Sequence, residues 1–204
     1  MKNFILILCF FLSLQVMAQN IEKVKNEKEI VWFGIDFSHV KFIGLPKHFN
    51  DLQKIRDLYF YSINYLIINE SKKFDLKGAF KKSTIIYDID SSTAKNERID
   101  INDIVQIKPN SLSKEQLSNI VNGYANPTSN KIGLLFVIES LNKFDNTEAI
   151  WITFFDIASG NIIFNHKLIA KPSGVGFRNY WAGGIYYLIK QSKKDFNKWL
   201  SLKK

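Results

Sequence analysis

Dense apolar runs and a two-residue alternation of apolar and polar positions mark the strands of this chain. Ile30–Phe37 is rich in β-branched and aromatic residues, and Ser83–Asp90 alternates as a half-buried strand does. Ile132–Ser140 and Ala149–Phe155 are almost continuously apolar, which predicts strands buried on both faces, with Ala149–Phe155 central in its sheet. Two shorter candidates are Val40–Ile43 and Ile104–Ile107.

Apolar residues three and four positions apart predict helices in three segments. These are Asn50 to about Asn69, Ser113–Tyr124, and Asn179 to Leu202. Ser113 and Gln116 match a capping box, which fixes the start of the second helix. The lysine-rich stretch between residues 70 and 82, with Gly78, is expected to be a loop, and 91–100 a short helix or a loop.

The order of the elements predicts the fold class. Asp156–Gly160 reads as a tight turn, so that Asn161–Ala170 completes an antiparallel hairpin. Helices lie between the early strands, whereas the last three strands follow one another directly. We therefore expect one domain over 30–204 of the α/β or α+β class, with a single mixed sheet, a C-terminal antiparallel hairpin region and helices packed on the sheet.

The first eighteen residues have the order of a secretory signal peptide. A short positive start precedes the uncharged apolar run Phe4–Leu14, and small residues then lead up to Ala18 and Gln19. The run is shorter than the roughly 20 residues that span a bilayer. We expect cleavage after Ala18 and export to the periplasm or the cell exterior, with 19–29 as a polar leader to the domain.

The position of the single cysteine excludes thiol chemistry from the predicted mature chain. The single cysteine, Cys9, lies inside the predicted signal peptide. Cleavage would therefore leave a chain without disulfides, a thiol nucleophile or thiolate metal ligands. A cysteine-free exported chain fits a bacterial envelope better than a small disulfide-rich extracellular module. Apolar residues make up 46% of the whole sequence, as in a globular protein.

The charge is strongly positive but dispersed. The sequence has 28 Lys and Arg against 19 Asp and Glu, a formal net charge of +9. The lysines are spread along the chain and do not gather in one motif, so no nucleic-acid partner is expected. They indicate a solvated surface or, as the alternative, attraction to an anionic envelope polymer or to lipid headgroups.

No motif for catalysis or metal binding is present. The three histidines, His39, His48 and His166, have no metal-ligand spacing, and Ser173 sits in a loop pattern and not in a nucleophile elbow. Asp36 interrupts an apolar strand and either faces a cleft or caps the strand end. We predict no catalytic residue, no metal site and no cofactor.

The glycine-rich segment Ser173–Gly184 follows a strand and opens the last helix. Asn179 occupies the third glycine position of a dinucleotide fingerprint, and the preceding strand belongs to a hairpin, which argues against a nucleotide site. The favoured interpretation is that Gly183 and Gly184, beside Trp181, let the helix pack closely on the sheet.

A binding role for the same segment remains open. Glycines let a backbone approach a partner, and a helix N-terminus favours anions. Phe177, Arg178 and Tyr180 have the composition of an interface hot spot. They form the candidate partner-binding patch.

The hairpin sequence FDIASGNII over 155–163, together with an early apolar strand and a long first helix, resembles small α/β domains of bacterial envelope accessory proteins. The amino-terminal domain of TolB and the CsgG domain are examples. The resemblance implies a role in envelope assembly or scaffolding and no catalytic residues.

Three functions follow from these observations. The first is a non-enzymatic envelope accessory or interaction module that binds another envelope component. The second is a hydrolase of an envelope polymer, which requires Asp36, His39 or His48 to meet another polar residue in a cleft. The third is a carrier of an apolar ligand, indicated by the 17 phenylalanines.

Overall fold

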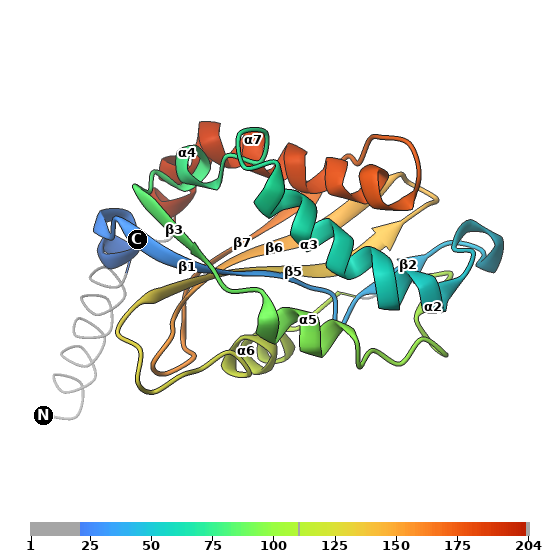
Figure 1. Cartoon of the computed structure of the whole chain (residues 1–204), viewed down its shortest axis with the longest axis horizontal. Helices are drawn as coiled ribbons and strands as arrows, with labels where there is room; N and C mark the ends of the chain where they lie inside the picture. The colour runs from blue at the N-terminus through green and yellow to red at the C-terminus, as the bar shows by residue number, and fades with distance from the viewer. Residues whose placement is uncertain (1–20, 110, 203–204) are drawn as a thin grey trace, which may run out of the picture.

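The computed structural model describes residues 21–109 and 111–202, so the predicted signal peptide lies outside the described residues. The chain forms one mixed sheet of seven strands with helices on both faces (Figure 1), which confirms the predicted fold class. After a helical stretch over 21–26, the elements are β1 (Glu29–Asp36), β2 (Lys41–Ile43), η1 (Pro46–His48), α2 (Leu52–Lys54), η2 (Ile55–Tyr59), α3 (Phe60–Asn69), α4 (Leu76–Phe80), β3 (Thr84–Tyr87), α5 (Asp90–Asn96), β4 (Val105–Gln106), α6 (Lys114–Asn122), β5 (Ile132–Asn142), β6 (Thr147–Asp156), β7 (Ile162–Ala170) and α7 (Phe177–Ser201).

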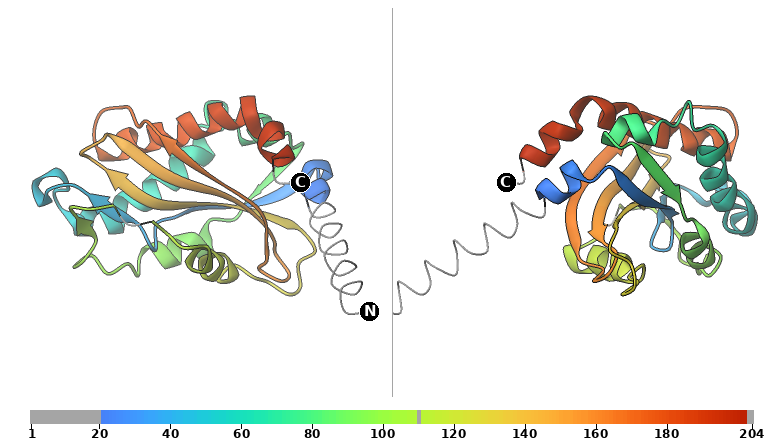
Figure 2. Two further views of the ribbon diagram at one scale, coloured as in Figure 1. Left: turned by 180° about the vertical axis from the view of Figure 1, so that it is seen from behind. Right: turned by 60° about the vertical axis from the view of Figure 1, so that its left-hand side comes forward.

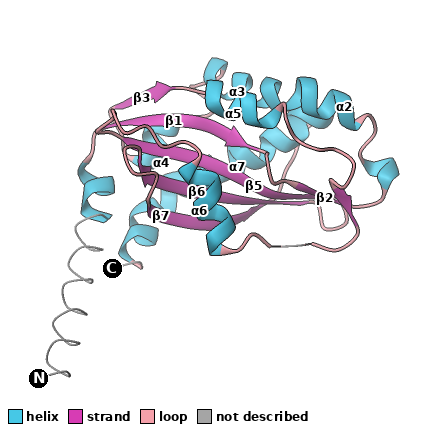
Figure 3. Ribbon diagram, turned by 90° about the horizontal axis from the view of Figure 1, so that it is seen from below, coloured by secondary structure: helices cyan, strands magenta, loops and turns pink. Residues whose placement is uncertain are grey.

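Strand β5 organises the sheet, and all eleven of its residues are buried. On one side it pairs in parallel first with β1 and then with β2, so the two short strands follow each other along the same edge of β5. Strands β3 and β4 extend the sheet beyond β1 and β2. On the other side β6 and β7 form the expected antiparallel hairpin (Figure 3), closed by a turn in which Gly160 has φ +71°.

The two faces of the sheet are covered unequally. Helices α3, α4 and α7 cover one face, and α5 and α6 lie on the other (Figures 1 and 2). The larger core cluster lies under α3, α4 and α7, where Phe80, Phe154 and Phe196 interlock with ring centroids 5.2–5.4 Å apart. Each fully buried ring of this kind contributes about 1.5–3 kcal/mol. Phenylalanine side chains thus fill the core between the sheet and the helices α4 and α7.

A bulge near the end of β1 is held by two buried asparagines. The register with β5 shifts between Trp32 and Ile35, at Gly34 with φ +87°. Ile35 N–H donates to Asn64 Oδ1 at 2.7 Å, and Phe37 N–H donates to Asn96 Oδ1 at 2.7 Å. The amide groups of both asparagines donate to Ile35 O. Side chains thus replace the sheet hydrogen bonds that the bulge removes.

Replacing Asn96 with alanine should lower the free energy of unfolding by about 2 kcal/mol, since it leaves the buried Phe37 N–H without an acceptor. Urea unfolding followed by circular dichroism measures the loss. Asn69→Ala, at the exposed end of α3, is the control and should change stability little. Equal effects of the two substitutions would contradict the role assigned to Asn96.

The predicted helix from Asn50 to Asn69 is present from Leu52, but a π-helical turn, η2, interrupts it. The wider turn lets two consecutive residues face inward. Phe60 stacks on Phe37 in the core, and Tyr59 stacks on Phe177 at the start of α7. The π-turn therefore positions one wall of the pocket described below.

Two other segments, predicted as a loop and as a polar leader, contain short helices. The predicted loop around Gly78 contains the short helix α4, because the Asp75 side chain accepts from Gly78 N–H and caps it. In the expected leader, residues 21–26 are helical and bury Ile21 and Val24 in the core. Apolar residues three positions apart among charges give that stretch one buried stripe.

Candidate functional site

A candidate site lies where α7 begins, at the end of the molecule opposite the last turn of α7 (Figure 1). The parallel strands β2 and β5 end here, and carboxyl ends of parallel strands are where open α/β sheets place ligands. The site is a pocket of about 400 Å³. It is lined by His48, Asn50, Tyr59, Lys143, Gly174, Gly176, Phe177, Tyr180 and Trp181.

Aromatic rings form the walls of this pocket, which we call the α7 pocket. Tyr59 and Phe177 are stacked, with centroids 5.3 Å apart and planes 18° apart. Phe177 and Tyr180 each meet the Trp181 ring edge-on, at 6.2 and 4.9 Å. Trp181 is buried, whereas Tyr59, Phe177 and Tyr180 are half-buried. The walls are therefore packed ring against ring and partly open to solvent.

Lys143, in the turn after β5, places its ammonium group over the aromatic wall. Its Nζ lies 3.7 Å from the Tyr180 ring centroid and 5.2 Å from that of Trp181. Burial lowers the pKa of Lys143 below its usual range. Within residues 21–109 and 111–202 this ammonium has no acidic partner and no hydrogen-bond acceptor. The charge is held in place by cation–π contacts alone.

Helix α7 begins without a side-chain cap. Gly176 occupies the N-cap position, no side chain bonds to the first turn, and the first turn contains no acidic residue. The first N–H groups of a helix have no partner within the helix. In a 25-residue helix they also carry the positive end of the helix dipole. The start of α7 thus adds positive potential to the pocket.

A buried carboxyl group lies beneath the pocket, between β6 and α7. Glu148 is 1% exposed, and its Oε2 has no hydrogen-bond partner among the described residues. Burial raises the pKa of Glu148 well above its usual value and so favours the neutral carboxyl form. A Cβ atom at Gly184 would lie 1.8 Å from that oxygen, so glycine makes room for the carboxyl group.

Exposed apolar side chains flank the pocket. Leu45, Phe144 and Val175 are 39%, 46% and 89% exposed. Leu45 and Phe144 both touch His48 of the pocket, through a backbone hydrogen bond and an edge-on ring contact, and Val175 lies between the lining glycines Gly174 and Gly176. We call these three residues the apolar rim. Exposed apolar side chains therefore adjoin the aromatic walls of the pocket.

Helix α7 separates the three residues of the predicted partner-binding patch, Phe177, Arg178 and Tyr180, between two pockets. Phe177 and Tyr180 line the α7 pocket, but Arg178 points into a neighbouring hollow of about 560 Å³ with Leu66 and Tyr186. Arg178 Nε donates to Asn179 Oδ1 at 3.0 Å. Successive residues of a helix point about 100° apart, which explains the separation.

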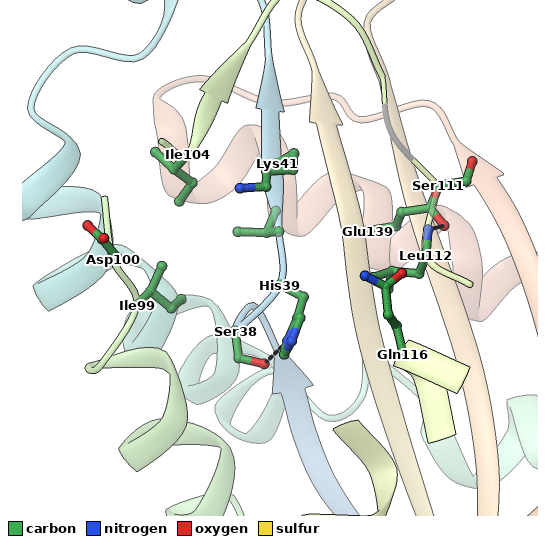
Figure 4. A pocket seen from close by; sticks show the side chains of 11 residues that line it. Ser38, His39, Lys41, Ile99, Asp100, Ile104, Ser111, Leu112, Gln116 and Glu139 are labelled. Atoms are coloured by element: carbon green, nitrogen blue, oxygen red, sulfur yellow. Dashed lines mark hydrogen bonds between the residues drawn. The ribbon is translucent and has the colours of Figure 1, made fainter. Parts of the chain in front are cut away.

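A second, polar pocket of about 240 Å³ lies between the β1–β2 connection and the loop before α6 (Figure 4). Ser38 and His39 face it, and Ser38 Oγ lies 2.9 Å from His39 Nδ1. Ser38 Oγ also donates to Asp36 Oδ1 at 2.5 Å. Asp36 and His39 thus come together as the hydrolase hypothesis requires, whereas His48 lines the α7 pocket instead.

The bonding of Asp36 is that of a structural group. The residue is fully buried and accepts hydrogen bonds from Ser38 N–H, Ser38 Oγ and the Tyr124 hydroxyl. The single proton of Ser38 is engaged by Asp36, so His39 does not act as its base. This cluster fixes the turn between β1 and β2.

Besides Asp100, the acidic residue that lines the polar pocket is Glu139. It is buried and forms an ion pair with Lys167 at 2.5 Å, while Trp151 Nε1 and Leu112 N–H donate to its other oxygen. Its charge is therefore fully engaged. In the described part of the chain, no group of three or more His, Cys, Asp or Glu side chains could hold a metal ion. His166 stacks on Trp199, remote from both pockets.

Sequence reasoning found part of the α7 pocket and missed part. Lys143 and His48 come from segments far from α7, and only the fold brings them there. Glu148 directly precedes the predicted apolar strand Ala149–Phe155 and was not recognised as part of the site. A charged residue at the edge of a run expected to be buried was the available signal.

No helix in the described residues is long and apolar enough to cross a membrane. A scan against protein-family models gives no match to this chain, and a search of curated proteins gives none either.

Proposed function

We propose that this chain is an exported interaction module of the bacterial cell envelope, without a catalytic role, that binds a protein partner through the α7 pocket and its apolar rim. The proposal rests on one observation above the others. Half-buried aromatic side chains and exposed apolar side chains gather at one end of the domain, beside an unpaired lysine.

The composition of this surface supports a protein partner. Tyr and Trp dominate the binding energy of interfaces, and such residues cluster in well-packed pockets surrounded by weaker contacts. Tyr180 and Phe177 occupy the pocket, and Leu45, Phe144 and Val175 surround it. An anionic polymer would instead be held by a row of lysines, and the pocket has one.

The bonding around Asp36 disfavours the hydrolase alternative, because its carboxylate is buried and used within the protein. The resemblance to domains of TolB and CsgG agrees with a scaffolding role. Export rests on the signal-peptide pattern of residues 1–18.

A photo-crosslinking residue at position 175 tests the proposal. We expect Val175→p-benzoylphenylalanine, expressed in the native cells, to form one adduct with another protein in the envelope fraction. The same residue at Leu202, which is 72% exposed and lies at the far end of α7 from the pocket, is the control and should form no such adduct.

Adding Tyr180→Ala to the position-175 probe should reduce the adduct at least tenfold, as expected for a hot-spot residue. Arg178→Ala, in the neighbouring hollow, should reduce it less. Identical adducts from positions 175 and 202, or none from position 175, would reject the proposed function.

A further inference from the structure

The polar groups that line the α7 pocket are chiefly hydrogen-bond donors. None of its nine lining residues is acidic. Lys143 contributes an ammonium group. His48 Nδ1 accepts from Leu45 N–H at 3.2 Å, so the proton of the neutral ring is on Nε2, which is then a donor. The lining is suited to a ligand that accepts hydrogen bonds.

One of these donors, the Lys143 ammonium, has no acceptor among the described residues. Its Nζ lies over the Tyr180 and Trp181 rings that line the pocket. Polar groups in such a setting are normally satisfied, so the unpaired lysine points to a missing acceptor. The uncapped start of α7 favours an acceptor with negative charge.

The acidic groups near the pocket do not neutralise Lys143. Asp51 accepts from Lys54 N–H and caps α2. Asp145 accepts from Asn142 Nδ2 at 2.9 Å. Burial raises the pKa of Glu148 well above its usual value and so favours its neutral form. No acidic side chain of the described residues forms an ion pair with Lys143, so its ammonium group is available to an anion from outside.

The walls and the rim of the α7 pocket indicate which further groups a ligand should have. Tyr59, Phe177 and Trp181 would contact an apolar group next to the anion. Leu45, Phe144 and Val175 extend the apolar surface past the pocket, farther than a small acid would need. A polypeptide end supplies all three parts: a carboxylate, an apolar side chain beside it, and a chain that continues over the rim.

We propose that the α7 pocket binds the C-terminal carboxylate of a partner polypeptide whose last residue is apolar. The carboxylate lies against Lys143 and the first turn of α7, and the last side chain lies between the aromatic walls. The inference rests on the proposed function and names the partner's chemistry.

Fluorescence anisotropy with labelled hexapeptides tests it. The probes are Gly-Ser-Gly-Ser-Gly-Leu and Gly-Ser-Gly-Ser-Gly-Phe, each with a free carboxyl end and as the C-terminal amide, plus an Asp-ended peptide and dodecanoate. We expect the free-acid Leu and Phe peptides to bind the signal-peptide-free chain at least tenfold more tightly than their amides. The Asp-ended peptide should bind weakly.

Variants place the carboxylate in the pocket. Lys143→Gln should reduce the preference for the free acid to threefold or less, and Lys143→Arg, which keeps the charge, should retain it. Lys171→Gln is the charge-matched control, because Lys171 is exposed and does not line the pocket. It should bind as the unchanged chain does.

Equal affinity for acid and amide peptides would overturn the inference, and so would binding of dodecanoate alone, which would assign the pocket to a small amphiphilic acid. If no peptide binds in either form while the position-175 probe still captures a protein, the proposed function stands and the carboxylate inference fails. If that probe also captures nothing, both fail.

Discussion

Replacing Glu148 with glutamine should stabilise the protein at neutral pH and leave its stability almost unchanged near pH 4. The carboxyl group is buried between β6 and α7 with Oε2 unpartnered, and burial raises its pKa well above the usual 4.5. Above pH 4.5 the unfolded chain releases this proton and the folded chain keeps it, so the folded state loses relative stability as pH rises.

The size of the effect follows from proton linkage. Each pH unit between the unfolded and the folded pKa lowers the free energy of unfolding by about 1.4 kcal/mol. Glutamine does not titrate, so the difference between Glu148→Gln and the unchanged chain should grow with pH in that window. Other carboxylates contribute equally to both proteins and cancel in the difference.

Urea unfolding from pH 4 to pH 8 measures this difference. Glu97→Gln, at an exposed glutamate near the end of α5, is the matched control and should give a difference close to zero throughout. A stability difference for Glu148→Gln that does not change with pH would show that Glu148 is ionised in the folded protein.

Two features that lower the stability of the fold lie next to the proposed binding site. A buried carboxyl without a partner and a glycine in the middle of a helix both reduce stability, and they meet at one place beneath Tyr180. Local rules are broken most often at functional sites. The coincidence supports placing the binding site directly above.

The elements of the fold were readable from the sequence because their patterns are local. Dense apolar runs predicted the strands β1, β5 and β6, the capping box predicted the helix α6, and apolar residues three and four positions apart predicted α7. The capping box at Ser113 and Gln116 is present as predicted. The order of strands around β5 was not readable, since parallel pairing joins segments about a hundred residues apart.

The site was readable only in part for the same reason. Phe177 and Tyr180 were found because they adjoin a glycine-rich helix start, and the close packing of that helix was expected from Gly183 and Gly184. Lys143 belongs to the site only because the end of β5 lies beside α7. The π-turn that re-aims Tyr59 leaves no simple sequence pattern, because a one-residue insertion merely shifts the helical period.

A glycine-to-alanine change normally stabilises a helix interior by about 1 kcal/mol. A decrease in the free energy of unfolding at Gly183 or Gly184 would therefore show that α7 packs too closely there to admit a Cβ atom. A Cβ at Gly183 would lie 2.0 Å from the Ser173 carbonyl oxygen and 2.7 Å from its nitrogen. Backbone cannot move aside as a side chain can. We expect Gly183→Ala to lower the free energy of unfolding by about 1–3 kcal/mol, measured in urea by tryptophan fluorescence.

Gly184→Ala should also destabilise the protein, but by a different obstacle that can be removed. The new Cβ meets the Glu148 carboxyl group, so adding Glu148→Ala should rescue Gly184→Ala with a coupling energy above about 1 kcal/mol. The same addition should not rescue Gly183→Ala, whose obstacle is the backbone of Ser173. Asn197→Ala, at an exposed position of α7, controls for helix propensity and should stabilise slightly. Rescue of both glycine variants, or of neither, would contradict the assigned contacts and require α7 to lie farther from β6 than it does here.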